Sequence, residues 1–159
     1  GDLHPGRARH LASLLGRVTD APVVAWDAAR PPLLPASWTV VLLDAPCSGT
    51  GTLRRHPELK WRLDEDAIRE RAALQARLIR AALPLVAPGG VLLYTTCSVE
   101  PEENEELFRD LPGGFDPVEL DRRVFGAPVL STPAGGVRLL PGPDWDGFTF
   151  HAVRRIARG

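Results

Sequence analysis

The sequence predicts one α/β domain, residues 1–159, in which a mostly parallel sheet is followed by an antiparallel hairpin. Two observations predict this class. Short β-branched runs that end in aspartate alternate with stretches of helical periodicity, which is the order of βαβ units. After Phe115 the pattern changes to short apolar runs joined by proline and glycine turns. A chain of this length is sufficient to bury one hydrophobic core.

The first elements are a helix and two strands. Apolar residues recur at helical spacing in 4–18, which predicts an amphipathic helix with Pro5 in its first turn and Gly16 near its end. Two β-branched runs follow at 22–27 and 39–44, and each has the composition of a buried parallel strand. The proline-rich segment between them is predicted to be a loop.

The middle of the chain predicts the longest helix and another strand. The helix runs from Asp64, a plausible N-cap, to Val86, because apolar residues share one face over this stretch. The sequence APGG at 87–90 is expected to end it, and 91–96 is an apolar strand. A further helix is predicted to begin at Pro101, where a run of glutamates suits the positive end of the helix dipole and needs no functional explanation.

Three runs after residue 114 are predicted to form short strands. They are 115–120, 137–147 and 148–155. The last alternates between apolar and polar residues, as antiparallel strands with one buried face do. The sequence therefore predicts that the chain closes with an antiparallel hairpin.

The composition excludes several classes. A formal net charge of −1 gives no global basic field, so a nucleic-acid partner must be argued from local clustering. Two cysteines without a CxxC motif argue against a disulfide framework and a structural zinc site, and they favour a cytoplasmic location without a metal. No apolar run is long enough to predict a membrane span.

Acids and thiols cluster at predicted strand ends. These positions are Asp2, Asp27, the segment 44–47 and the segment 96–98. Each alone has an ordinary explanation, since aspartate after a strand is common in turns and a lone cysteine usually packs as a small hydrophobe. Ligands of open α/β sheets bind outside the carboxyl ends of the strands, so together these residues predict a functional site at one edge.

Two long motifs resemble a known family. The sequences LLDAPCSGTGTLRRHPELKWR and PGGVLLYTTCSVEPEENEE are similar to the fourth and sixth motifs of the Sun-type RNA cytosine-5 methyltransferases, and RRHPELKW resembles the bacterial small-subunit (16S) ribosomal RNA enzymes. The closing LLPGPDWDGFTFHAVRR is similar to the terminal hairpin of the family, so the resemblance covers nearly the whole chain. It implies a Rossmann-like class I fold, S-adenosylmethionine as methyl donor and small-subunit ribosomal RNA as partner.

The resemblance also implies residue roles. Carbon 5 of cytosine is a poor nucleophile, so a thiolate first adds to carbon 6. The resemblance makes Cys97 this nucleophile and gives Cys47 a part in product release. It places Asp44 in the pocket for base and donor, Asp2 on the ribose hydroxyls of the donor and Asp27 beside its adenine.

The loop after the first thiol adds shape and charge. Pro46 is expected to stiffen it, while Gly49 and Gly51 let it pass close to a flat base. A basic cluster follows, which is either a phosphate-contacting lip or a solvated loop, two readings that charge alone supports equally. The cluster consists of Arg54, Arg55, His56, Lys60 and Arg62. Trp61 is expected in the core rather than stacked on a base.

Two other functions remain open on residue types. A cysteine hydrolase would pair one of the thiols with His56 or His151, although no spacing supports that pairing. A non-catalytic RNA-binding or assembly module would not need the thiols. His4, His10 and His151 show no metal or triad spacing, so surface or packing roles are expected.

Two parts of the family pattern are not found in the sequence. They are the glycine-rich donor loop with its first strand, and the RNA-binding region that precedes the catalytic domain. We therefore expect a truncated catalytic domain that binds the donor weakly and is inactive by itself. Unpaired strand edges are also expected to favour self-association.

Overall fold

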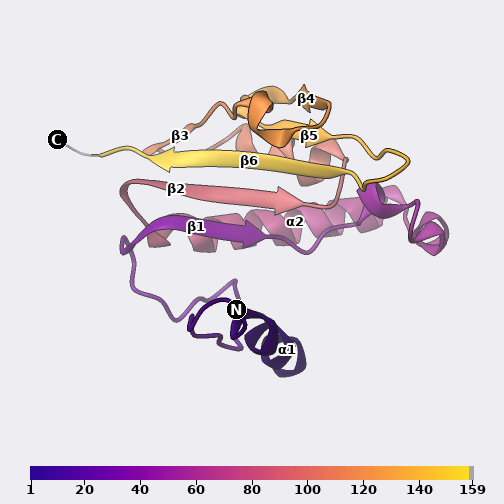
Figure 1. The fold of residues 1–159 in the computed structure, drawn as a ribbon. Helices are drawn as coiled ribbons and strands as arrows, with labels where there is room; N and C mark the ends of the chain where they lie inside the picture. The colour runs from indigo at the N-terminus through magenta and orange to yellow at the C-terminus, as the bar shows by residue number, and fades with distance from the viewer. Residues whose placement is uncertain (158–159) are drawn as a thin grey trace.

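The computed structural model describes residues 1–157. A six-stranded sheet in the order β1-β2-β6-β5-β4, with β3 also paired to β6, carries the long helix α2 on one face (Figure 1). The elements are α1 (Pro5–Leu15), β1 (Trp38–Asp44), η1 (Thr50–Thr52), η2 (Pro57–Trp61), α2 (Glu65–Ala82), η3 (Leu83–Leu85), β2 (Val86–Thr96), η4 (Pro101–Glu103), η5 (Glu105–Phe108), β3 (Phe115–Pro117), η6 (Arg122–Phe125), β4 (Val129–Ser131), η7 (Pro133–Gly135), β5 (Val137–Leu139) and β6 (Phe148–Arg155).

The sheet changes from parallel to antiparallel along its width. Strand β1 pairs parallel with β2, whereas β6 runs antiparallel to β2, β3 and β5. The predicted closing hairpin is therefore confirmed, and the short strand β4 is an addition that the sequence pattern did not predict. The class of fold matches the prediction.

Helix α2 begins where predicted and ends early. The Asp64 carboxylate accepts a hydrogen bond from the Ala67 N–H at 2.8 Å, so Asp64 is the N-cap. The helix ends at Ala82 instead of Val86, because Pro84 lacks the N–H that a further turn requires. The segment 87–90 consequently lies within β2 and does not act as a helix stop.

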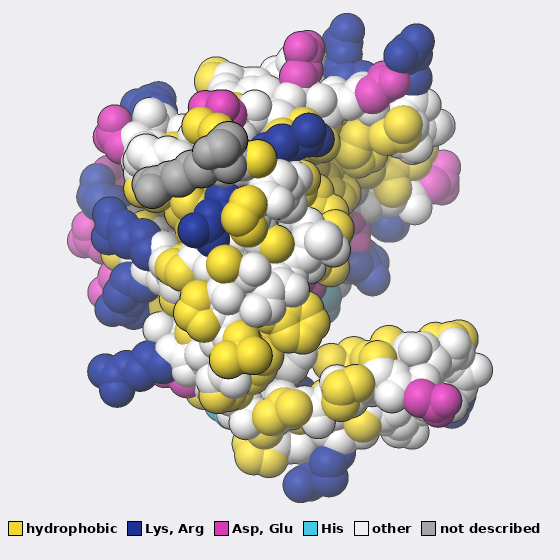
Figure 2. All heavy atoms as spheres, turned by 90° about the vertical axis from the view of Figure 1, so that its left-hand side faces the viewer, with side chains coloured by type: hydrophobic (Ala, Val, Ile, Leu, Met, Phe, Trp, Pro, Cys, Tyr) yellow, Lys and Arg dark blue, Asp and Glu magenta, His cyan; other side chains and the backbone are white. Residues whose placement is uncertain are grey.

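The N-terminal segment, residues 1–30, contains one of its two predicted elements. Helix α1 forms, and Gly16 caps it. The predicted strand 22–27 is wrong, because only Ala25 forms a bridge, to Asp2, and no neighbouring strand extends the pairing among the described residues. Figure 1 draws this segment apart from β1, and in Figure 2 the lower part of the molecule projects below a surface rich in hydrophobic side chains.

Strand β1 is more exposed than its sequence predicts. In the described part of the chain β1 pairs only with β2, so its other edge is open. Val40 is 57% exposed and Leu42 is 65% exposed. The prediction of a buried strand is therefore wrong. A β-branched strand is buried only where other elements cover its faces, and residues 1–157 provide no layer over Val40 and Leu42.

The acidic stretch after Pro101 forms two 3₁₀ turns instead of one helix. Asn104 separates η4 from η5 with φ −132° and ψ −106°, which is not helical. Its buried side chain accepts a hydrogen bond from Thr96 Oγ1 at 2.8 Å and donates one to the Glu100 carbonyl at 2.7 Å. These two side-chain hydrogen bonds replace the helical ones that the sequence favours.

The core lies between α2, the sheet and η5. Tyr94 on β2 is fully buried, and its ring meets Phe108 edge to face with centroids 5.3 Å apart. The buried cluster consists of Ala45, Ile79, Ala82, Leu83, Val86, Leu92, Tyr94, Phe108 and Val153. None of the helices formed by residues 1–157 has the length and apolarity that crossing a membrane requires.

Candidate active site

The two cysteines meet at the carboxyl ends of β1 and β2. Because these strands are parallel neighbours, both end at the same edge of the sheet, with Asp44 opposite Thr95. The Sγ atoms of Cys47 and Cys97 lie 3.3 Å apart, and both thiols are partly buried and free of disulfides. The convergence that the sequence predicts is therefore found. We call residues 44–52 and 94–105 the thiol corner.

The contact between the thiols makes them unlike each other. The two sulfurs share a hydrogen bond. With its proton on Cys47, this bond lowers the pKa of Cys97 to about 7 even though partial burial and the Asp44 and Glu103 carboxylates oppose the shift. The same contact and deeper burial raise the pKa of Cys47 far above its usual range. At neutral pH the pair thus holds one proton on Cys47 and a reactive thiolate fraction on Cys97.

Asp44 ends β1 beside the thiol pair. Its carboxylate accepts a hydrogen bond from Thr95 Oγ1 at 3.2 Å, and the side chain stays exposed at the edge of the sheet. Its charge is close enough to Cys97 to oppose ionisation of that thiol. This position leaves Asp44 available to a molecule bound at the edge.

The two glycines of the loop have different purposes. Gly49 has φ +76°, a conformation that other residues rarely adopt. Gly51 N–H donates to the Cys97 carbonyl at 3.0 Å, and its own carbonyl accepts from Gly147 N–H at 2.7 Å. A side chain on Gly51 would overlap the Gly147 carbonyl, so here glycine permits contact with the segment before β6.

Glu103 is the residue that sequence reasoning missed. It is fully buried, and its carboxylate accepts hydrogen bonds from Ser48 N–H at 2.8 Å, from the Ser48 hydroxyl and from Gln75 Nε2 at 3.0 Å. Gln75, also fully buried, donates to the Pro46 carbonyl at 2.9 Å as well. The sequence did not distinguish Glu103 from the other glutamates of this run. Nothing in the sequence pattern shows that Glu103 is buried while its neighbour Glu102 is exposed.

Buried hydroxyl and amide groups fix the second thiol. The Ser98 carbonyl accepts hydrogen bonds from Thr149 Oγ1 at 2.8 Å and from Asn104 Nδ2 at 3.2 Å. The Ser98 hydroxyl lies 3.2 Å from Thr50 Oγ1 and accepts from Glu100 N–H at 3.1 Å. These contacts join the loop after β1 to the loop after β2, so the positions of the two thiols depend on each other.

Asp2 and Asp27 lie in the N-terminal segment. Asp2 Oδ1 accepts from His4 N–H at 2.8 Å and from Arg7 Nε at 3.0 Å, which together hold the pKa of Asp2 below its usual value. Asp27 accepts from Ala29 N–H at 2.9 Å. Within residues 1–157 no hydrogen bond or ion pair connects either acid to the thiol corner.

The basic cluster is partly neutralised. Arg54 and Arg55 both pair with Asp146, and His56 pairs with Glu58. These ion pairs reduce the field that the charge count suggests, although the arginine side chains remain about half exposed.

Trp61 lies on the surface beside this cluster. It is 82% exposed, so the prediction that it belongs to the core is wrong. It ends the short η2 helix, where no other element covers it, and Lys60 Nζ lies 5.1 Å from the ring centroid. Its exposed ring is free to meet an external partner.

The histidines lie away from the thiols. His151 is buried and stacks on Phe108 with centroids 4.7 Å apart, and burial lowers its pKa to about 4. The expected packing role of His151 is confirmed, and His4 and His10 are exposed as expected. Neither thiol bonds to a histidine in the described chain, so the arrangement of a cysteine hydrolase is not formed.

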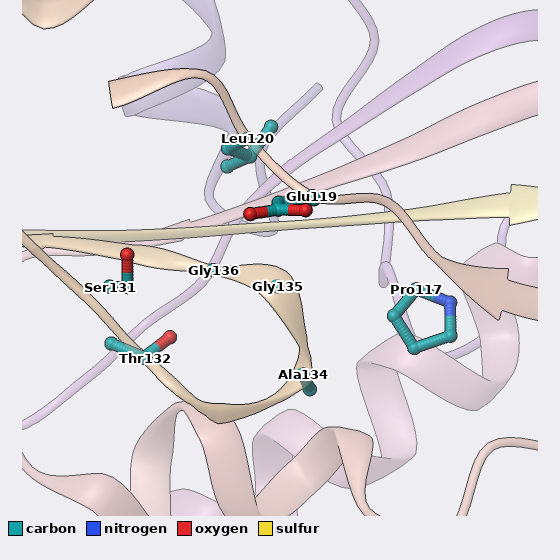
Figure 3. Close-up of a pocket in the computed structure, with 8 residues that line it drawn as sticks. All are labelled: Pro117, Glu119, Leu120, Ser131, Thr132, Ala134, Gly135 and Gly136. Carbon is teal, nitrogen blue, oxygen red and sulfur yellow. The ribbon is translucent and has the colours of Figure 1, made fainter. Parts of the chain in front are cut away.

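A hollow of about 410 Å³ lies away from the thiols, and it is one of two of this volume in the described part of the chain. Figure 3 shows its walls, which come from residues 117–120 and 131–136. It contains neither thiol nor any predicted site residue. Within residues 1–157 no group of three or more histidine, cysteine or acidic side chains is arranged to hold a metal ion.

The sheet and its pair of thiols define a Rossmann-like methyltransferase fold, and solved structures agree. The crystal structure of PH0851 matches with a TM-score of 0.86 and 34% identity, covering 97% of this chain and 36% of that one. A methyltransferase homolog protein from Pyrococcus horikoshii matches with a TM-score of 0.75 and 28% identity, covering 98% of this chain and 52% of that one.

The chain belongs to the 16S rRNA methyltransferase RsmB/F family, whose model matches residues 1–154. Ribosomal RNA small subunit methyltransferase B from Cronobacter sakazakii is 45% identical over 111 residues, which are 69% of this chain and 24% of that protein. The chain thus spans about a quarter of the length of the curated relatives that it matches.

Proposed function

We propose that this chain is the catalytic part of an enzyme that methylates carbon 5 of a cytosine in small-subunit ribosomal RNA, with S-adenosylmethionine as donor. Membership of the RsmB/F family supports methyl transfer to ribosomal RNA. The observation that carries the cytosine-5 chemistry is the pair of thiols, 3.3 Å apart at the ends of neighbouring parallel strands. A ribosomal RNA enzyme of this kind acts in the cytoplasm.

Cys97 is the nucleophile in this proposal. Its sulfur forms a bond to carbon 6 of cytosine, and the ring electrons move toward carbon 5, which becomes nucleophilic. S-adenosylmethionine supplies an electrophilic methyl group. Carbon 5 then loses its proton to a base, and the electrons left behind expel the Cys97 sulfur from carbon 6. The lowered pKa of Cys97 supports its assignment to the first step.

Cys47 and Asp44 act beside the nucleophile. The Cys47 thiol lies 3.3 Å from the Cys97 sulfur, so it is placed to stabilise that sulfur by a hydrogen bond, without giving up its proton, as the carbon–sulfur bond breaks. Asp44, exposed at the same edge, accepts hydrogen bonds from the amino edge of cytosine. Both roles use groups that need no large movement.

The donor is held by Asp2, Asp27 and Asp44 in this proposal. Asp2 fits a ribose hydroxyl, because His4 and Arg7 both bond to Oδ1 and leave Oδ2 without a hydrogen bond in the described chain. Asp27 is placed for adenine. The fit of these acids is incomplete within 159 residues, since they share no contact with the thiol corner. The chain by itself is therefore expected to bind S-adenosylmethionine weakly and to be inactive.

RNA contact is assigned to the surface that follows the thiol loop. Arg54, Arg55 and Arg62 provide phosphate contacts, and exposed Trp61 provides a stacking surface for a base. His56 and Lys60 complete the cluster. This surface adjoins the loop that bears Cys47, so a cytosine flipped toward the thiols keeps its flanking phosphates near these cations.

Self-association is proposed at the open edge of β1. The edge carries unpaired backbone groups, and Val40 and Leu42 are exposed beside it. Light scattering of the purified 159-residue chain tests this, with a dimer or higher species expected. A strict monomer with a cooperative melt contradicts it.

Substitution of each thiol in the full-length protein tests the proposed chemistry. Cys97→Ala is expected to abolish methyl transfer to ribosomal RNA, with a loss of at least about 10³-fold because the covalent route is removed. Cys47→Ala is expected to accumulate a covalent complex between protein and RNA, visible on a denaturing gel. Unchanged methylation by Cys97→Ala would exclude this mechanism.

A further inference from the structure

Two thiols at one edge pose a question of selection. Cys47 and Cys97 follow parallel neighbouring strands, and their sulfur atoms are in contact. Either thiol can act as a nucleophile once it is deprotonated. When the pair has lost one of its two protons, the remaining proton lies on one sulfur or on the other. Some feature of the fold must decide which sulfur keeps that proton.

Glu103 is bound on the Cys47 side of the pair. Its carboxylate accepts both the N–H and the hydroxyl of Ser48, the residue directly after Cys47. Gln75 bridges Glu103 to the carbonyl of Pro46, the residue directly before Cys47. Both chain neighbours of Cys47 are thus held by one buried carboxylate and its amide partner, whereas the chain neighbours of Cys97 are held by the neutral amide of Asn104.

This arrangement makes a thiolate at Cys47 unfavourable. The two Ser48 donors, which lie next to Cys47, are used by Glu103 and are not available to a charged sulfur. The carboxylate adds negative charge near both thiols. A proton held by Cys47 in the contact between the two sulfurs offsets that charge at Cys97 alone. The other titratable groups that face the pair are Asp44, which opposes ionisation of Cys97, and the Tyr94 hydroxyl, which donates to the Glu103 carbonyl oxygen at 2.7 Å.

We propose that Glu103 is a positioning residue that keeps the shared proton on Cys47 and so makes Cys97 the nucleophile. The inference rests on the proposed function, because it explains which thiol attacks. It does not depend on methyl transfer for its test, since thiolate reactivity is measured directly. A failure of this inference therefore leaves the assignment of the reaction untouched.

Site-resolved alkylation of the reduced 159-residue chain tests the proposal. Limited iodoacetamide at pH 6 to 9, followed by peptide mass spectrometry, gives the ratio of Cys97 to Cys47 adducts. The wild-type ratio is expected to be about tenfold at pH 7, because the thiolate is the reacting species. Glu103→Gln, which keeps the shape and removes the charge, is expected to lower that ratio at least about fivefold.

Two further variants keep the test decisive. Glu106→Gln removes an exposed acid that pairs with Arg109 and is expected to retain the wild-type ratio. If Glu103→Gln does not fold, Ser48→Ala removes one donor of the same contact, and the ratio is expected to fall about twofold. A wild-type ratio in folded Glu103→Gln, or in Ser48→Ala when Glu103→Gln is unfolded, overturns the proposal.

Discussion

The thiol corner and the N-terminal segment are held in place by different means, although the family resemblance implies roles for residues of both. In the thiol corner, fully buried Glu103 connects two loops through hydrogen bonds to Ser48 and Gln75, which lie in distant parts of the chain. In the N-terminal segment, the carboxylates of Asp2 and Asp27 accept hydrogen bonds from residues at most five positions away.

The difference shows how a site can be complete in one part and open in another. Buried polar groups lose free energy when a partner is removed, so the thiol corner has one arrangement and tolerates little change. Exposed acids with local partners keep water as an alternative partner. The proposed nucleophile is therefore organised within 159 residues, whereas the proposed donor contacts are not joined to it.

Two glycine substitutions, one in each region, test this difference most strongly. Gly51→Ala is expected to destabilise the chain by about 3 kcal/mol, because the new methyl group overlaps the Gly147 carbonyl. Gly6→Ala in α1 meets no atom within 4 Å and is expected to be neutral or stabilising by up to about 1 kcal/mol. Urea denaturation measures both. Equal losses would show that the two regions are equally constrained.

The pH dependence of the free energy of unfolding tests a buried group beside the thiol corner. This group is His151 on β6, which lies opposite Tyr94 on β2. Burial lowers the pKa of His151 to about 4, so between pH 6.5 and 4 the unfolded chain binds a proton that the folded chain does not. Stability is therefore expected to fall as pH decreases through this window, by about 3 kcal/mol in total. The free energy of unfolding at pH 7 and pH 4.5 measures it.

His151→Asn tests the source of that loss. It is expected to reduce the stability difference between the two pH values, with His10→Asn on the exposed side of α1 as the control for removing an imidazole. If His151→Asn keeps the whole wild-type difference, the acid sensitivity arises elsewhere in the molecule.

The smallest expected difference concerns single polar side chains. Asn104→Ala removes hydrogen bonds to Thr96 and to the Glu100 and Ser98 carbonyls, and it is expected to cost about 1.5 kcal/mol because these groups are buried. Asp27→Ala removes one exposed bond to Ala29 N–H and is expected to change stability by less than about 0.5 kcal/mol. Thermal melts of both variants measure the two effects. Similar shifts in Tm would contradict the proposed difference between the thiol corner and the N-terminal segment.

Local sequence patterns succeeded where the structure uses local interactions. The Asp64 cap, helix α1 and the alternating strand β6 all formed as predicted, because capping and periodicity depend on near neighbours. The predicted strand 22–27 and the buried state of β1 failed. A strand needs a partner and a covering layer, and the chain alone does not show whether these are present.

The sequence by itself determined the class of fold and the meeting of two thiols, since parallel neighbouring strands must end at the same edge. Only the tertiary structure decided which acid matters there. Glu103 looks like its neighbours in the sequence, but burial against Ser48 and Gln75 distinguishes it. The reason is physical, because desolvation and long-range hydrogen bonds arise from packing and leave no local pattern in the chain.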